Sequence, residues 1–189
     1  MTQIHDARGA HRVAVPRSKP QRGTYALVFR LARGRDVCVG RLGRFYLRPA
    51  FYVYVGSAFG PGGLAARLEH HLGSLARPHW HVDHLRHAAD LEEIWLAEGS
   101  VRREHAWATL LRELPRAAIA LRRFGSSDCS CESHLFEFPR RPSVRTFQRR
   151  VRDRFPNDAP VRSLALNALT QRQTVSAEHI VLDFRNGQF

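Results

Sequence analysis

The chain has 189 residues, 43% of them hydrophobic, and carries a formal net charge of +13 at pH 7. This length supports one ordinary hydrophobic core, so we expect a single domain with extensions and not two domains. No segment approaches the roughly 18 consecutive apolar residues of a membrane span, and the polar N-terminus lacks the apolar segment of a secretion signal. The odd number of cysteines, three, provides no disulfide framework, which predicts a protein of the reducing cytoplasm.

The positive charge is concentrated in the flanks of the chain. Residues 1–22 carry a net charge of +4 and residues 140–154 carry +6, whereas residues 23–139 carry only +3. A surplus of this size favours a polyanionic partner and indicates nucleic-acid binding. The first 22 residues mix Arg, Gly, Pro, Ser and His without an apolar period, which predicts a disordered basic arm.

From Gly23 onward, the pattern of apolar residues predicts strands first and helices later. Strands are expected at residues 25–31, 36–40, 45–47, 51–55, 93–96 and 133–138, with 36–40 and 45–47 forming an extra hairpin. Helices are expected from residue 64, shortly after residue 78, and over residues 102–114 and 143–155. A glycine cluster at residues 60–63 separates the early strands from the first helix.

These elements predict an α+β fold, with a small and mainly antiparallel central sheet flanked by helices. The strand at 133–138 is expected at one edge of this sheet. We expect a core domain over residues 23–139, followed by an Arg-rich C-terminal extension over residues 140–189. Ser143 is expected to cap the helix of the extension. The arginines on its polar face are expected to bind nucleic acid: Arg145, Arg149, Arg150 and Arg152.

Two tyrosines and an arginine form the most informative pattern of the chain. Gly23-Thr24-Tyr25 opens one strand, Tyr54-Val55-Gly56 closes another, and Arg67 lies on the following helix. Tyrosines in strands are ordinary by themselves, because aromatic residues favour strands and mostly pack. Together, however, a phenol can hold or activate water and a guanidinium can bind two phosphate oxygens, which suits cleavage of phosphodiester bonds.

Three further segments extend the pattern, at residues 52–58, 78–83 and 124–136. With the two tyrosine motifs they resemble the GIY-YIG nuclease superfamily, and most closely its small standalone Uri-type branch. The resemblance spans about residues 23–138 and implies a GIY-YIG-like fold. It also implies that Tyr54 lies near the attacking water and that Arg67 contacts the scissile phosphate. The chain departs from the superfamily in the long separation of its tyrosines and in Ser57, where many members have lysine.

The resemblance further implies one metal-binding glutamate on a later helix, and Glu104 is the candidate. A single carboxylate suffices for Mg²⁺, because this ion keeps several waters and binds phosphate oxygens; Mn²⁺ is a possible substitute. The structural alternative is a solvent-facing glutamate beside Arg102 and Arg103. Weaker candidates lie close to the strand at 93–96: Glu92, Glu93 and Glu98.

Six of the eleven histidines lie between residues 70 and 87. We expect the following residues to line the cleft: Ser57, His71, His79, His81 and Asp83. His79, His81 and Asp83 have the alternative role of ordering the turn at Pro78. His71 falls within the apolar stripe of its helix, so it has the alternative roles of packing in the core or supporting Arg67.

A zinc site is a separate hypothesis, which His79, Cys129, Cys131 and His134 could form. We favour packed thiols instead, because a Cys-x-Cys pair on a strand places both sulfurs on one face, unlike the wider spacing of common structural zinc sites. The run from Ser126 to Asp128 is interpreted as a tight turn, since no Gly-x-Ser-x-Gly motif surrounds it.

The sequence therefore predicts a Mg²⁺-dependent endonuclease that acts on DNA or alternatively RNA, as a monomer or weak dimer. Tyr54 would position or deprotonate water, Arg67 would stabilise phosphate charge, and Glu104 would hold the metal. Tyr25 would orient this group. The competing classes are a non-catalytic nucleic-acid-binding module with a vestigial site and a zinc-stabilised interaction protein.

Overall fold

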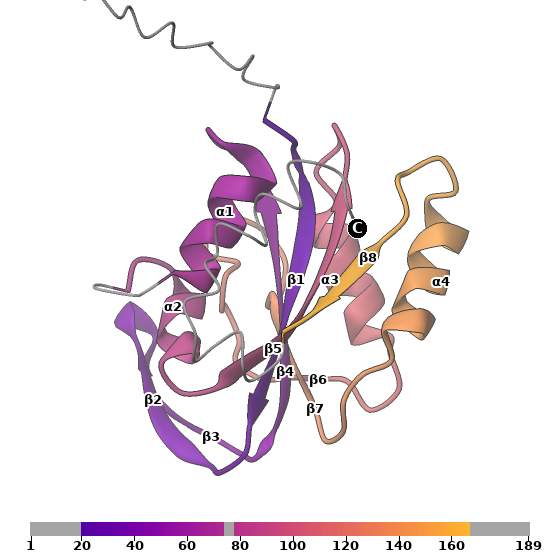
Figure 1. Ribbon diagram of the computed structural model, residues 1–189. Helices are drawn as coiled ribbons and strands as arrows, with labels where there is room; N and C mark the ends of the chain where they lie inside the picture. Colours follow the sequence, from indigo (N-terminus) through magenta and orange to yellow (C-terminus); the bar gives the residue numbers. More distant parts are fainter. Residues whose placement is uncertain (1–19, 74–77, 167–189) are drawn as a thin grey trace, which may run out of the picture.

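A computed structural model describes residues 20–73 and 78–166 (Figure 1). Its main sheet is antiparallel and contains β1 (Gly23–Leu31), β4 (Ala50–Ala58), β5 (Asp90–Glu98), β6 (Ala118–Ile119), β7 (Leu135–Phe138) and β8 (Arg162–Ala165). A separate hairpin is formed by β2 (Arg35–Val39) and β3 (Gly43–Leu47). The helices are α1 (Gly63–Leu72), α2 (His81–Arg86), α3 (Glu104–Arg112) and α4 (Val144–Arg154). The predicted α+β class and the extra hairpin are both confirmed.

The main sheet is buried on both faces. Along β1, Tyr25, Leu27 and Phe29 belong to one hydrophobic core, whereas Ala26 and Val28 belong to the other. This division follows from the alternation of side chains along a strand. The first core is covered by α1, α2 and the hairpin, and the second by α3 and α4 (Figure 1). Among the described helices, none has the length and apolarity needed to cross a bilayer.

The strand order is β6-β7-β4-β1-β5-β8. The prediction that residues 133–138 form an edge strand is therefore wrong, because β7 lies between β6 and β4. The outer neighbour β6 contains only two residues, Ala118 and Ile119. A strand of that length has no alternating pattern for the sequence to reveal.

The C-terminal extension expected from residue 140 packs as an integral part of this fold. Phe147 of α4 stacks on Trp95 and meets Trp107 edge-on, with ring centroids 5.1 Å apart in both pairs. Beyond α4, β8 pairs with β5 in the main sheet. The predicted cap is confirmed, since the Ser143 hydroxyl accepts a 3.2 Å hydrogen bond from the Thr146 N–H. Most of the predicted basic arm and the far C-terminus lie outside the described residues.

Candidate active site

A cavity of about 400 Å³ lies at the end of the sheet where β1 begins and β4 ends. It brings together the four predicted catalytic residues, Tyr25, Tyr54, Arg67 and Glu104. It is also lined by four of the five predicted cleft residues, namely Ser57, His71, His79 and His81. These residues come from β1, β4, α1, α3, the start of α2 and the segment that leads into it.

The pairing of β1 with β4 places the two tyrosines on one face of the sheet. Tyr25 lies opposite Gly56, and Tyr54 lies opposite Leu27, so the tyrosines are diagonal neighbours. Gly56 is required here, because a Cβ atom at this position would overlap the Tyr25 hydroxyl and lie 2.6 Å from its Cζ. Gly125 leaves space for Tyr54 in the same way, since a Cβ atom at this position would lie 2.7 Å from the Tyr54 Cε2.

Both tyrosines remain phenols at neutral pH. Burial raises the pKa of Tyr25 well above its usual value, and the neighbouring Tyr54 raises it further. Burial also raises the pKa of Tyr54; the Glu104 carboxylate adds to this effect and the Arg67 guanidinium opposes it. The hydroxyl groups are therefore suited to forming hydrogen bonds and not to removing a proton.

His71 supports Tyr25 from inside the core. Its Nε2 lies 2.8 Å from the Tyr25 hydroxyl, and its side chain is only 1% exposed. Burial and the nearby Arg86 lower the pKa of His71 to about 3, so the imidazole is neutral. The sequence predicted that His71 lines the cleft, with packing in the core or support of Arg67 as alternatives. The hydrogen-bonding partner of His71 is Tyr25 and not Arg67.

Arg67 projects from α1 and stacks on Trp80, with its Cζ 4.1 Å from the centre of the Trp80 ring. This cation–π contact fixes the plane of the guanidinium. Among the described residues, no carboxylate lies within ion-pair distance of Arg67, so its donors remain available to a ligand. Sequence reasoning assigned Trp80 no role, although it lies in the segment 78–83 that carries the resemblance.

Asp83 does not line the cavity, which corrects the expectation for this residue. It is fully buried and accepts hydrogen bonds from the backbone N–H groups of His79 (2.8 Å) and Trp80 (2.9 Å). The His70 ring lies 3.1 Å from its other oxygen. Burial raises the pKa of Asp83, but these hydrogen bonds outweigh burial and the net shift is downward. Asp83 therefore orders the turn before α2, the alternative role that the sequence suggested.

His81 holds the loop that closes the cavity over Tyr54. Its Nδ1 accepts a 3.0 Å hydrogen bond from the Gly125 N–H. The preceding residue, Phe124, meets the Tyr54 ring edge-on at a centroid distance of 5.9 Å. Ser126 is fully buried, and the turn expected in this run is formed by Ser127 and Asp128.

Glu104 is the first residue of α3, and its side chain is 12% exposed. The start of this helix is fixed by Thr24, whose hydroxyl accepts a 3.2 Å hydrogen bond from the Arg103 N–H. The Arg103 guanidinium in turn binds both oxygens of Asp158, at 2.7 and 3.1 Å. Within the Gly23-Thr24-Tyr25 motif, Thr24 therefore positions α3, the helix that begins with Glu104, and Tyr25 lines the cavity.

The Glu104 carboxylate fits the requirements of a Mg²⁺ ligand. It lies 3.9 Å from the Arg102 guanidinium, at the outer limit of an ion pair, and 3.4 Å from the His105 ring. Asp128 lines the same cavity and offers a second carboxylate. Carboxylate oxygens and water are the ligands that Mg²⁺ prefers.

The other predicted candidates lie elsewhere. Glu92 and Glu93 both form ion pairs with Arg141, and Glu98 forms one with Arg162. These carboxylates therefore take part in ion pairs near the outer strands of the sheet. The four predicted nucleic-acid-binding arginines lie on α4, which covers the face of the sheet opposite α1. Arg145, Arg149 and Arg152 are exposed, whereas Arg150 is partly buried and pairs with Glu113 at 3.2 Å: none of the four lines the cavity.

Residues 24–156 match the family described as a domain of unknown function, DUF123, and the chain belongs to this family. The match runs from Thr24 to just beyond α4, so it includes every residue of the cavity and the helix that carries the exposed arginines. No curated protein and no solved structure matches the chain.

Proposed function

We propose that this chain is a Mg²⁺-dependent endonuclease that hydrolyses phosphodiester bonds in DNA. One observation carries the proposal: Tyr25, Tyr54, Arg67 and Glu104 come from four different elements and line one cavity. The resemblance of the tyrosine motifs to GIY-YIG nucleases supports the same reaction. We also place the enzyme in the cytoplasm, in keeping with its three free cysteines.

Arg67 is proposed to bind the scissile phosphate. A guanidinium donates two parallel hydrogen bonds to phosphate oxygens, and it remains charged at any physiological pH. Because Trp80 already holds the Arg67 side chain, little conformational entropy is lost when phosphate binds. The guanidinium is therefore in place to stabilise charge that develops on the phosphate oxygens during cleavage.

Tyr54 is proposed to position the attacking water by hydrogen bonding. The residues alone are compatible with this role or with that of a base, but burial raises the pKa of Tyr54 and favours hydrogen bonding. Tyr25 lies beside it, held by His71, and orients the same group of hydroxyls.

Glu104 is proposed to hold Mg²⁺, with Mn²⁺ as a possible substitute. When bound, the ion supplies Lewis-acid polarisation of the phosphate and lowers the pKa of a bound water. The role of Glu104 itself is to present a carboxylate at the edge of the cavity that Arg67 also faces. Thr24 and Arg103 keep this carboxylate in position by fixing the start of α3.

The test is cleavage of a panel of labelled duplex, single-stranded, nicked and branched DNA, and of RNA, with and without Mg²⁺ or Mn²⁺. Arg67→Ala and Glu104→Gln should each lower cleavage on the order of 100-fold or more while retaining a cooperative thermal melt. The matched controls are the exposed residues Arg44 and Glu69, changed to Gln, which should cut at the wild-type rate. Wild-type cleavage by both folded site variants would refute the proposed site. Binding without cleavage of any substrate would instead favour the non-catalytic binding module.

A further inference from the structure

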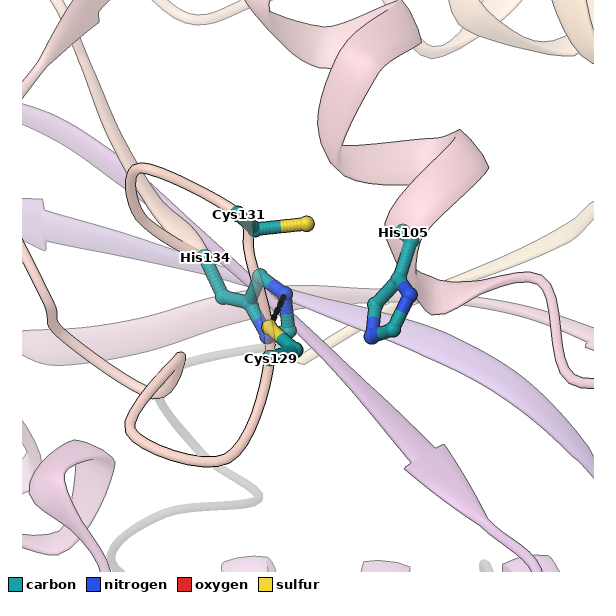
Figure 2. Close-up of side chains that lie close together, drawn as sticks. All are labelled: His105, Cys129, Cys131 and His134. Atoms are coloured by element: carbon teal, nitrogen blue, oxygen red, sulfur yellow. Dashed lines mark hydrogen bonds between the residues drawn. The ribbon is translucent and has the colours of Figure 1, made fainter.

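Four potential metal ligands lie together beside the catalytic group proposed above, and one of them, His134, also lines its cavity. They are His105, Cys129, Cys131 and His134, and their ligand atoms all lie within 4.8 Å of one another. Figure 2 shows His105 projecting from the first turn of α3 toward the loop that carries the other three side chains. The mechanism proposed for cleavage uses none of these four side chains.

The geometry is close to that of a tetrahedral zinc site. Zn–S bonds of ~2.3 Å and Zn–N bonds of ~2.0–2.1 Å place a sulfur and a nitrogen about 3.6 Å apart at tetrahedral angles. The Cys129 Sγ and the His134 Nε2 are 3.6 Å apart. The remaining separations, up to 4.8 Å, require only modest side-chain adjustment. His105 can make that adjustment, because its side chain is 53% exposed.

The loop backbone holds the His134 side chain in place. The His134 N–H donates to the Phe124 carbonyl at 2.8 Å, and the Val55 N–H donates to the His134 carbonyl at 2.9 Å. The Nε2 atom of the His134 ring lies 3.6 Å from the Cys129 Sγ, so this nitrogen already faces a ligand sulfur.

We infer that His105, Cys129, Cys131 and His134 bind a structural Zn²⁺ ion. Two thiolates and two imidazoles form a closed ligand set that is typical of structural zinc and unlike the oxygen ligands that Mg²⁺ prefers. Binding converts both thiols to thiolates and releases their protons to solvent.

This inference revises two expectations from the sequence. The cysteines lie in an irregular loop before β7 and not on a strand, so the Cys-x-Cys spacing allows their sulfurs to converge. The fourth ligand is His105 instead of His79, which lines the catalytic cavity beside Trp80. The ion would therefore join the start of α3 to the loop over residues 125–134, two segments that also contribute Glu104 and Gly125 to the cavity.

The experiment measures the metal content of the purified full-length chain by plasma mass spectrometry after dialysis against metal-free buffer. We expect about one zinc per chain in the wild type, and we expect tetrahedral d–d and sulfur charge-transfer bands when Co²⁺ replaces it. The double substitution Cys129→Ser/Cys131→Ser should abolish both signals. Cys38→Ser and His87→Ala remove exposed residues elsewhere and should leave the zinc content unchanged.

His105→Ala provides a variant that spares the core, because the side chain is largely exposed. Its zinc affinity, measured by chelator competition, should fall more than about 100-fold, since loss of even an outer-shell partner typically costs 10–100-fold. A wild type that holds no zinc after reconstitution would overturn the inference, as would zinc retained by the double cysteine variant. A Cys129–Cys131 disulfide, detected as a single free thiol per chain, would also overturn it. Glu104→Gln should keep its zinc, so this result is independent of whether the chain cuts DNA.

Discussion

His71 should make the stability of this protein fall steeply in mild acid. The imidazole is neutral in the folded state because burial lowers its pKa to about 3, whereas an unfolded histidine titrates near 6.5. Below pH 6.5 the unfolded chain therefore binds a proton that the folded chain does not. The contribution of His71 is fully present above pH 6.5 and is lost as the pH falls toward 3.

The two pKa values set the size of the effect. Between pH 7 and pH 4 the linkage relation gives a loss of about 3 kcal/mol in the free energy of unfolding, since each pKa unit corresponds to ~1.4 kcal/mol. A loss of that size is a large fraction of the ~5–15 kcal/mol that stabilises a typical domain. The low pKa has named causes, which are burial first and then the charges of Arg86, His70 and Arg67.

The assay is urea denaturation of the wild type and of His71→Gln at pH 7, 5.5 and 4. Glutamine offers a polar group to Tyr25 but does not titrate, so the variant should lose less stability than the wild type, by about 3 kcal/mol at pH 4. Comparison of the two proteins cancels the titration of all other groups, including Asp83. The control is His87→Gln, an exposed substitution that should keep the wild-type pH dependence. Equal slopes for wild type and His71→Gln would refute the assignment of a buried neutral imidazole.

Two further predictions concern Gly56 and helix α4. Gly56→Ala should displace the Tyr25 ring, cost about 1–3 kcal/mol in a thermal or urea melt and lower cleavage, whereas Gly60→Ala, with open space around it, should do neither. Loss of the exposed arginines of α4 should flatten the salt dependence of DNA affinity by about 0.9 per phosphate contact, as measured by fluorescence anisotropy. The variants should be point substitutions of Arg145, Arg149 and Arg152 to Gln, since deletion of α4 would remove the buried Phe147. An unchanged slope would show that these arginine side chains do not contact DNA.

The convergence of Tyr25 and Tyr54 was expected from the family resemblance of their two motifs, and in the structure the pairing of β1 with β4 produces it. Side chains two residues apart on a strand share a face, and helical spacing placed Arg67 beside a buried stripe. Gly56 leaves room for the Tyr25 ring, whereas Gly23 leaves room for the Ala97 carbonyl and the Leu64 side chain. Strand alternation and helical spacing are short-range rules that the sequence contains directly, whereas the register of β1 against β4 joins distant residues.

The loop over residues 121–134 could not be predicted in the same way. Its course depends on Arg123, which adopts a positive φ of 64° although it is not glycine, and on the two-residue strand β6. Neither feature has a sequence signal, because the left-handed region is normally assigned to Gly, Asn or Asp. The proximity of this loop to His105 also depends on how α3 packs across the sheet. The sequence pattern therefore placed the cysteines on a strand and grouped them with His79, whereas the structure groups them with His105.

Glu104 and His105 are consecutive residues at the start of one helix, and this adjacency links the two proposed metal sites. Neighbouring side chains on an α-helix point about 100° apart, so one can face the cavity while the other faces the thiols of Cys129 and Cys131. The two sites need not compete for metal, because carboxylate oxygens favour Mg²⁺ and thiolates favour Zn²⁺. Any coupling between the two ions would be reciprocal, because each would affect the other through the first turn of α3. The contact that would carry it is that of the Glu104 carboxylate with the His105 ring, at 3.4 Å, and Glu104→Gln would remove none of the four proposed zinc ligands.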